Sequence, residues 1–410
     1  MWLVSNDVFR FANLIWGLRV RTVFMKNCAK MVARTFFGVC LVSLYSGQAS
    51  GQTVQDQVNG ATVFSSIPVN ITQKFKPSPS KKAKLDFENW DHFLDSIILY
   101  MGPAVRKRAP KVMESGTRIV ARDDSTYRYE GNKVVYTYMN DAEKAWLKGY
   151  VRDLESLANK TDVTTLSRED QLAFWYNLHN SAIIDIIADY YPVKFPERIK
   201  PLSESSGSLH EAKIFNISGV PLSLRDIREK IVYPNWKNPL VIYGFHHGNL
   251  GGPSIATAAY DRDNLFLNLR QNADEFINSF RSYHLGKISV LYRDVSPHYF
   301  PAGEADIRAH FRKYMRPDVY KYVETYDKLK WHKPFAQVAD VAGGVGFGNS
   351  TSPVARVGQG GAAGSPPAFT EAVSARAKRI VIARERGYFS NEVIIEDIES
   401  GDTDLNESEK

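Results

Sequence analysis

Two adjacent histidines stand in a glycine-rich stretch of the chain, and imidazole is the side chain whose ordinary pKa lies closest to neutral pH. The stretch covers residues 244–253 and reads GFHHGNLGGP. Its first interpretation is a structural turn after a buried strand. A second is a ligand-binding loop, because a glycine-rich turn can direct backbone N–H groups at an anion. A third is a hydrolase-like site with His247 or His246 as general base near Glu229 or Asp226.

The same stretch gives little support for a nucleotide or a metal. It lacks the lysine and the serine or threonine of a phosphate-binding P-loop. Neighbouring side chains on a strand point to opposite faces, which disfavours one metal ion held by both histidines. We therefore predict no metal and no cofactor. If the loop binds a ligand, its candidate contacts are Gly248, Asn249, Gly251 and Gly252.

A second polar group interrupts an otherwise apolar segment, residues 174–180, which reads FWYNLHN. A buried amide without a partner loses on the order of 1–3 kcal/mol, so Asn177 and Asn180 need hydrogen bonds. We interpret them first as internal staples to neighbouring loops. The alternative is the wall of a ligand pocket, with Asn177, His179 and Asn180 as contacts. For His179, a packed core histidine is favoured over a ligand.

Five stretches in order resemble the bacterial and plant family called domain of unknown function 547. Members of that family typically read AFWxNxYNA, then LSLDDIEHxILR, then HFALNCASxSCP. Asn177 and Asn180 match its paired asparagines, and His179 stands at its tyrosine. Ser223, Leu224, Asp226 and Ile227 match the second motif. The resemblance covers about residues 84–332, and the stretches are AFWYNLHNSAIIDIIADYYPVKFPERI, GVPLSLRDIREKIVYP, NPLVIYGFHHGNLGGPSI, ISVLYRDVSPHYF and YDKLK.

The departures from the family concern its Cys/His pattern, which suggests a thiol nucleophile with a histidine base. His247 stands at the first cysteine of that pattern and Gly252 at the second. Ile242 and Glu229 stand at its histidines, so they offer no imidazole to a group at position 247, and Arg228 replaces its glutamate. Thiol chemistry needs a thiolate, which is absent here. The resemblance thus implies a binding or structural module rather than an enzyme, with the histidine-based hydrolase as the alternative.

The elements that must position these residues predict a helix-rich α+β domain. One long helix, residues 168–191, has an N-cap at Ser167 and an apolar stripe, which is typical of a helix at the centre of a domain. A continuous apolar run at residues 240–245 predicts a strand buried on both faces. We expect a single domain over residues 84–332, with a small, mostly antiparallel sheet around the central helix. Further helices are expected at 87–101, 141–159, 222–232, 263–280, 305–313 and 318–325, a turn of helix at 254–260, and strands at 118–138, 212–217 and 287–292.

Residues 1–52 are expected to be an N-terminal extension and a signal peptide, with the true start at Met25. A basic flank precedes the apolar run TFFGVCLVSLY, and Gly47 and Ala49 fit a cleavage site. This predicts a periplasmic or secreted protein with no membrane span after signal removal; an uncleaved anchor is the alternative. Residues 53–83 read as a linker. Residues 333–410 read as a largely disordered Gly/Ala/Ser-rich segment and acidic tail, with a short basic helix at 369–386.

The charge of the chain does not indicate nucleic-acid binding. The net charge is +7, but residues 1–52 hold six basic residues and one acidic residue, so about +2 remains after them. No later Lys/Arg run could follow a phosphate backbone. Both cysteines, Cys28 and Cys40, lie in the leader, as suits an oxidising compartment. The expected partner is a polar small molecule or a protein.

Overall fold

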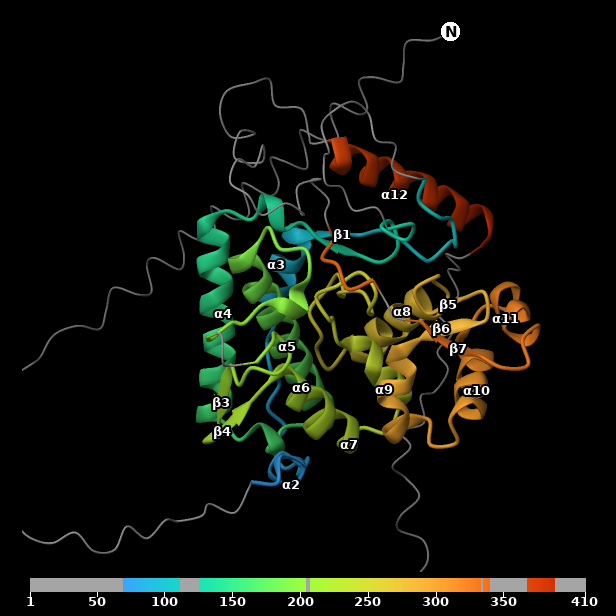
Figure 1. Ribbon diagram of the computed structural model, residues 1–410. Coiled ribbons are helices and arrows are strands. Elements are labelled where there is room, and N and C mark those ends of the chain that lie inside the picture. The colour runs from blue at the N-terminus through green and yellow to red at the C-terminus, as the bar shows by residue number, and fades with distance from the viewer. Residues whose placement is uncertain (1–68, 111–124, 204–206, 333–334, 340–366, 388–410) are drawn as a thin grey trace, which may run out of the picture. The chain divides into compact units, whose positions relative to one another are not determined.

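The computed structural model describes residues 69–110, 125–203, 207–332, 335–339 and 367–387. The expected signal segment, residues 118–124 of the expected strand region, and most of the expected C-terminal segment 333–410 lie outside these ranges. Among the described residues, no helix combines the length and the apolar character that a membrane crossing requires. The fold is a helix-rich α+β arrangement, as the sequence predicts (Figure 1).

Helix α5 (Arg168–Tyr190) is the centre of this fold, and nearly all of its residues are buried. It begins where predicted, because the Ser167 hydroxyl accepts the Asp170 N–H at 3.1 Å. Helix α4 (Asp141–Lys160) packs along it and begins at a capping box of Asn140 and Glu143. Since α5 has neighbours on every side, its position fixes the polar side chains that project from it.

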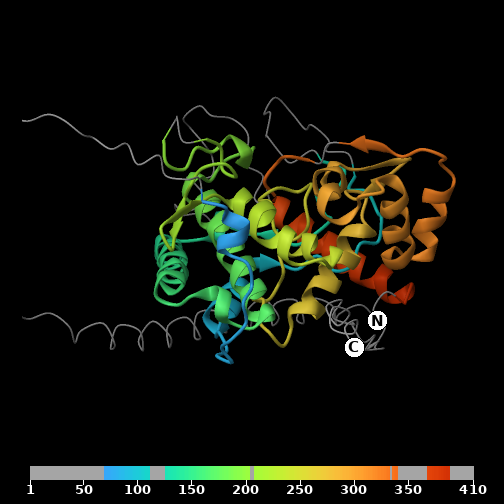
Figure 2. The same ribbon diagram turned by 90° about the horizontal axis from the view of Figure 1, so that it is seen from below.

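The other helices are arranged around and beyond α5, with α4 at one end of the described body and α10 and α11 at the other (Figure 2). A π-helical segment at Ile227–Val232 follows the short α6 and carries Arg228. The bounds are α2 Ile71–Lys74, α3 Glu88–Ile97, α6 Leu224–Asp226, α7 Tyr233–Asn235, α8 Leu265–Ile277, α9 Val290–Tyr299, α10 Glu304–Tyr314, α11 Pro317–Glu324 and α12 Pro367–Glu385, with short 3-10 turns at Tyr136–Tyr138, Val163–Thr165 and Pro196–Arg198.

Within the described ranges, the strands form three small sheets, where one small sheet was expected. Two are antiparallel pairs, β1 (Ile98–Leu99) with β2 (Lys133–Val134) and β3 (Phe215–Ile217) with β4 (Val220–Leu222). The third has the order β5 (Tyr283–His284), β6 (Lys287–Ser289) and β7 (Lys330–His332). Its β6–β7 pairing is parallel and the others are antiparallel. The expectation of mostly antiparallel pairing is confirmed.

The predicted buried strand at 240–245 is wrong, and this matters because it carries the histidines. Pro239–Gly244 is a 3-10 helix, started by the Asn238 side chain, which accepts the Leu240 N–H at 2.9 Å. A continuous apolar run has no periodicity that separates a strand from a buried helical turn. A Cβ at Gly244 would lie 2.4 Å from the Tyr176 ring, so this helix can lie directly against α5 only with glycine there.

Three smaller expectations also fail. The strand expected at 287–292 ends at Ser289, whose hydroxyl accepts the Leu291 N–H and begins α9. The helix expected at 254–260 is irregular backbone. Within the described part of 118–138, only β2 is a strand.

Residues on both flanks of the expected domain pack onto it. Phe75, within the segment interpreted as a linker, is buried with its ring 5.5 Å from that of Trp175. At the other end, Val338 is 2% exposed and its N–H donates to the Lys194 carbonyl. Helix α12 contributes Ala372 to a second apolar cluster with Met101. The packed body therefore includes residues on both sides of 84–332.

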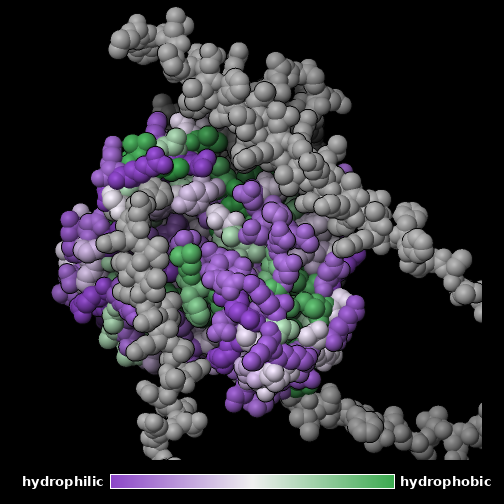
Figure 3. Space-filling view, turned by 180° about the vertical axis from the view of Figure 1, so that it is seen from behind, coloured by the Kyte–Doolittle hydropathy of each residue, from purple (hydrophilic) through white to green (hydrophobic). Residues whose placement is uncertain are grey.

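The surface over the described elements is mixed in character. The face in Figure 3 is mostly hydrophilic, with hydrophobic groups between the polar ones. Large apolar side chains that remain exposed include Leu285, Tyr322 and Trp331.

Candidate functional site

The two histidines of the glycine-rich turn face different surroundings, as predicted, although they follow a 3-10 helix and not a strand. His246 is 8% exposed, and its Nδ1 lies 3.4 Å from the Pro253 carbonyl oxygen across the turn. The His247 ring lies 5.9 Å from the ring of His210. The turn therefore separates a cavity on the His246 side from a cluster of cationic and imidazole groups on the His247 side.

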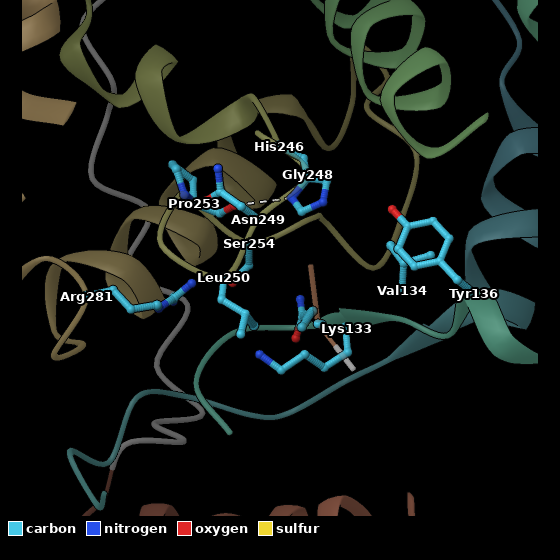
Figure 4. A pocket seen from close by; sticks show the side chains of 12 residues that line it. Lys133, Val134, Tyr136, His246, Gly248, Asn249, Leu250, Pro253, Ser254 and Arg281 are labelled. Atoms are coloured by element: carbon cyan, nitrogen blue, oxygen red, sulfur yellow. Dashed lines mark hydrogen bonds between the residues drawn. The ribbon is translucent and has the colours of Figure 1, made fainter. Parts of the chain in front are cut away.

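The cavity has a volume of about 20 Å³ and lies between this turn and the segment 132–136 (Figure 4). That is room for about one water molecule or one terminal polar group. Lys133 and Arg281 line it from one side and His246 from another. The complete lining is Asn132, Lys133, Val134, Tyr136, His246, Gly248, Asn249, Leu250, Pro253, Ser254, Arg281 and Ala339.

One polar group in the cavity wall has no partner. Tyr136 is 4% exposed, and its hydroxyl makes no hydrogen bond within the described residues. In Figure 4 this hydroxyl points toward the turn that carries His246. A buried hydroxyl without a partner is costly unless something occupies the adjacent space. The cavity thus has an unused donor and acceptor aimed at it.

Burial and cations keep His246 neutral. Burial, together with the charges of Lys133 and Arg281, lowers the pKa of His246 to about 4. A neutral imidazole has one donor and one acceptor nitrogen. Because its Nδ1 approaches the Pro253 carbonyl, the tautomer with the proton on Nδ1 is favoured. The other nitrogen is then an acceptor.

A buried ionic network fixes the cationic side of the cavity. Arg281 donates to the Gly252 carbonyl at 2.9 Å and to the carboxylate of Glu275, which also accepts from Ser254. Glu130 lies 3.8 Å from Arg281 and accepts the Phe280 N–H. Burial raises the pKa of Glu130, while Arg281 and Arg379 of α12 act in the opposite direction. Arg281 is thereby held against the turn.

On the other side of the turn, His247 belongs to a cluster with His179, His210 and Arg228. Arg228 is 6% exposed, and its Nη1 lies 2.8 Å from His179 Nε2 and 3.4 Å from His210 Nδ1. Burial first, and then the Arg228 charge, hold the pKa values of all three histidines well below their usual range. The cluster is therefore one cation with three neutral imidazoles.

The asparagines are staples, as their first interpretation predicted. Asn177 accepts the Tyr260 N–H at 3.1 Å and donates to the Tyr260 carbonyl at 2.7 Å. Asn180 accepts the His246 N–H at 3.0 Å and donates to the Gly244 carbonyl at 2.8 Å. Each amide has both its oxygen and its nitrogen engaged. These contacts fix the path of the chain on either side of the turn.

His179 is also held internally, as favoured from the sequence. It is 0% exposed, and its ring packs edge-on against Phe245 with a centroid distance of 4.8 Å. Its Nδ1 lies 3.1 Å from the Asn180 side-chain oxygen. Since Arg228 donates to its other nitrogen, His179 positions the guanidinium and is itself out of reach of a ligand.

The backbone N–H groups of residues 250–252 in the glycine loop are already used. The Asn249 side-chain oxygen accepts the N–H groups of Gly251 and Gly252, each at 3.0 Å. The Leu250 N–H donates to the Gln337 carbonyl at 2.8 Å. Gly248 has φ +75°, and a Cβ there would lie 2.6 Å from Ile187. A ligand in the cavity would contact Gly248 and Asn249, which line it. It would not meet a row of free N–H groups.

The carboxylates considered as catalytic partners do not meet the histidines. Asp226 forms a capping box with Ser223 and pairs with Lys213 and Lys230. These bonds hold the pKa of the Asp226 carboxyl well below its usual range. Glu229 is exposed and lies 3.7 Å from Arg225.

No carboxylate is among the groups that shift the pKa of His246 or His247. The structure thus does not assemble the histidine–carboxylate pair of the hydrolase alternative. Among the residues with described positions, no group of three or more His, Cys, Asp or Glu side chains is arranged to hold a metal ion.

Several important residues were not found from the sequence. His210 lies 37 positions before His247 in a segment without a pattern, yet it supplies the imidazole that positions 229 and 242 lack. Arg228 was noted only as a departure from the family pattern. Lys133, Tyr136 and Arg281 come from segments with no motif. Only the replacement of a glutamate by arginine at 228 could have drawn attention to the cluster.

Comparison with known proteins gives one match. Residues 163–277 match the model of a family described as "Protein of unknown function, DUF547". This range includes α5, the π-helical segment and the turn with both histidines, and it ends with α8. Neither curated proteins nor solved structures show a significant similarity to the chain.

Proposed function

We propose that this chain, a DUF547 domain-containing protein, is an exported module that binds a small polar ligand without cysteine chemistry. The observation that supports binding most directly is the cavity between the turn and segment 132–136, with an unpartnered Tyr136 hydroxyl in its wall. A neutral His246 and two cationic side chains surround the same space. Export rests on the basic and apolar layout of residues 26–52.

The chemistry of the lining indicates which group would enter. Lys133 and Arg281 are cationic donors, Tyr136 can donate or accept, and His246 can accept through Nε2. A terminal hydroxyl, amide or carboxylate oxygen would meet several of these groups at once. Since the volume is about 20 Å³, only such a terminal group fits, with the rest of the ligand outside.

The absence of thiol chemistry rests on residue identity. His247 occupies the position of the family's first cysteine, and the only cysteines of the chain, Cys28 and Cys40, precede the described residues. Imidazole at position 247 is neutral and lies among other imidazoles, with no carboxylate among the groups that shift its pKa. Binding is therefore favoured over catalysis.

Tyr136→Phe tests the binding site, because it removes the unpartnered hydroxyl and little else. Formate and acetamide serve as small probes, and their binding is followed through the NMR signals of the His246 imidazole. We expect saturable shifts with at least one probe and a weaker affinity in Tyr136→Phe. Tyr243→Phe, at a tyrosine bonded to His310, is the control and should keep the affinity. Absence of any saturable shift would contradict the proposal.

A further inference from the structure

We propose that the buried guanidinium of Arg228 is a separate binding site, for a carboxylate group of a small molecule. It lies on the His247 side of the turn, and it does not share Lys133, Tyr136 or Arg281 with the cavity. Nothing in the function proposed above requires it. The inference rests on charge, on unused donors and on the placement of His210 and His247.

The guanidinium of Arg228 is a buried cation without a charged partner among the described residues. Arg228 is 6% exposed, so its cation is largely removed from water. The carboxylates that raise its pKa, Glu229 and Glu211, are exposed and pair with Arg225. Within the described residues, Arg228 forms no ion pair. A buried cation without a counter-charge is destabilising, and a bound anion would remove that penalty.

The Arg228 guanidinium has N–H donors that its described neighbours do not use. Both hydrogen-bonding contacts of the Arg228 guanidinium involve Nη1, which faces His179 and His210. Within the described part of the chain, no contact uses Nη2 or Nε. These two atoms form one edge of the guanidinium, and a carboxylate can accept two parallel hydrogen bonds from such an edge. The His179 contact leaves this edge in a fixed orientation.

His247 offers a second polar group beside Arg228. Its Nε2 is buried and has no hydrogen-bond partner within the described residues. His210 and His247 are only half-buried, whereas His179 and Arg228 lie deeper. A ligand would therefore approach past these two rings. The His247 imidazole could then hydrogen-bond to the same carboxylate that Arg228 holds.

The charge of the cluster determines which anion it can hold. With all three histidines neutral, the cluster carries a single positive charge from Arg228. A monoanion balances this charge, whereas a dianion would bring a second buried charge without a partner. The planar shape of a carboxylate also matches the planar edge of the guanidinium. A carboxylate is thus favoured over a phosphate group.

Acetate is the probe, added to the full chain at a constant ionic strength that is maintained with sodium chloride. We expect a saturable rise of the thermal midpoint with acetate, because a ligand that binds only the folded state stabilises it. Arg228→Gln should lower the affinity on the order of thirtyfold or more. Arg225→Gln removes an exposed arginine three residues earlier and should leave the affinity unchanged.

Arg228→Gln also leaves His179 with a different partner, so a second variant is needed in case folding is impaired. His247→Leu orphans no group, since Nε2 has no partner, and it should fold and bind acetate more weakly. The NMR signals of the His210 imidazole report this site and those of His246 report the cavity, which separates the two. A saturable acetate shift of the His210 signals that survives in both Arg228→Gln and His247→Leu would overturn the proposal. So would tighter binding of inorganic phosphate than of acetate.

Discussion

Nη1 of Arg228 lies 2.8 Å from Nε2 of His179, so a buried guanidinium donates to a neutral imidazole rather than to a carboxylate. This contact requires the His179 proton to be on Nδ1, which lies 3.1 Å from the Asn180 oxygen. The same oxygen accepts the His246 N–H. One line of hydrogen bonds therefore connects the cation of the cluster to the backbone of the turn.

The asparagine staples predict a measurable loss of stability. Asn177→Leu and Asn180→Leu should each lower the free energy of unfolding by about 1–3 kcal/mol, because each leaves a buried N–H and a buried carbonyl without a partner. Urea unfolding gives the values. Asn268→Leu is the matched control, since the Asn268 side-chain nitrogen has no partner, and its effect should be much smaller. Equal effects at all three positions would contradict the stapling.

The unpartnered tyrosine predicts a contrast between two hydroxyl deletions. Tyr136→Phe should leave the free energy of unfolding of the ligand-free protein unchanged or raise it, because no bond is lost. Tyr243→Phe should lower it by about 1–2 kcal/mol, because the Tyr243 hydroxyl lies 2.7 Å from His310 Nε2. Chemical denaturation of both variants side by side tests this. A loss in Tyr136→Phe as large as that in Tyr243→Phe would mean that the hydroxyl has a partner.

Asp185 of α5 predicts a pH dependence. Burial, with Asp189 nearby, raises its pKa to about 6, and its Oδ1 has no partner. Since the folded pKa exceeds the unfolded one of about 3.9, the folded state binds the proton more tightly. The resulting contribution is complete below pH 4 and is lost as pH rises through 6.

Asp185→Asn should therefore raise the free energy of unfolding at pH 7 by up to about 3 kcal/mol. The difference from the unchanged protein should shrink to near zero at pH 4, which is the internal control. Denaturation measured across pH 4–8 tests it. A difference that is the same at both ends of this range would show that the ionisation of Asp185 is not its cause.

A thiol introduced at position 247 should be activated, contrary to what the sequence predicts. From Ile242 and Glu229 alone, no group would stabilise a thiolate there. The structure places Arg228 and His210 beside this position. The pKa of the thiol in His247→Cys should lie below the reference of about 8.5, because the Arg228 cation favours the thiolate.

Alkylation rate against pH, in a background without Cys28 and Cys40, measures this pKa. Adding Arg228→Gln should raise it, and adding Arg225→Gln should not. If the thiol titrates at the reference value in all three proteins, the Arg228 charge does not reach position 247, and the anion site would lose its electrostatic basis.

Export predicts a defined new N-terminus. The apolar run and the small residues that follow it indicate cleavage near Ser50 to Thr53. N-terminal sequencing of the protein from the medium or periplasmic fraction of its host tests this. Exported material that still contains Cys40 would contradict cleavage and favour the anchor.

The sequence predicts what depends on local pattern. Helices with apolar periodicity agree with the structure to within a few residues, as at α10 and at the capped helices α4 and α5. The strand at 240–245 fails because a fully buried apolar run has no period, and its glycine at 244 serves a close approach to Tyr176 that only the tertiary structure creates. The asparagine staples could be foreseen because a buried amide must find a partner.

The site itself could be predicted only in part. His246 and His247 stand out as neighbours in a glycine-rich turn, but their surroundings come from distant segments. His210 reaches His247 because the segment before β3 folds back, and Arg228 faces inward because the π-helical segment sets its orientation. No spacing of residues in the sequence predicts these contacts. Sequence alone therefore assigned the carboxylates Asp226 and Glu229 to the histidines, whereas their real partners are lysines and an arginine.

The hydrogen bonds between the turn and residues 335–339 determine when the turn can acquire all of its partners during synthesis. The N–H groups of Leu250 and Gly251 donate to the carbonyls of Gln337 and Phe335, more than 80 residues later in the chain. During synthesis the turn is made well before these carbonyls exist, so these two hydrogen bonds can form only after residue 337 has been added. A polypeptide that stops at residue 277, where the family match ends, would lack both carbonyls, so these two N–H groups of the turn would lose their partners.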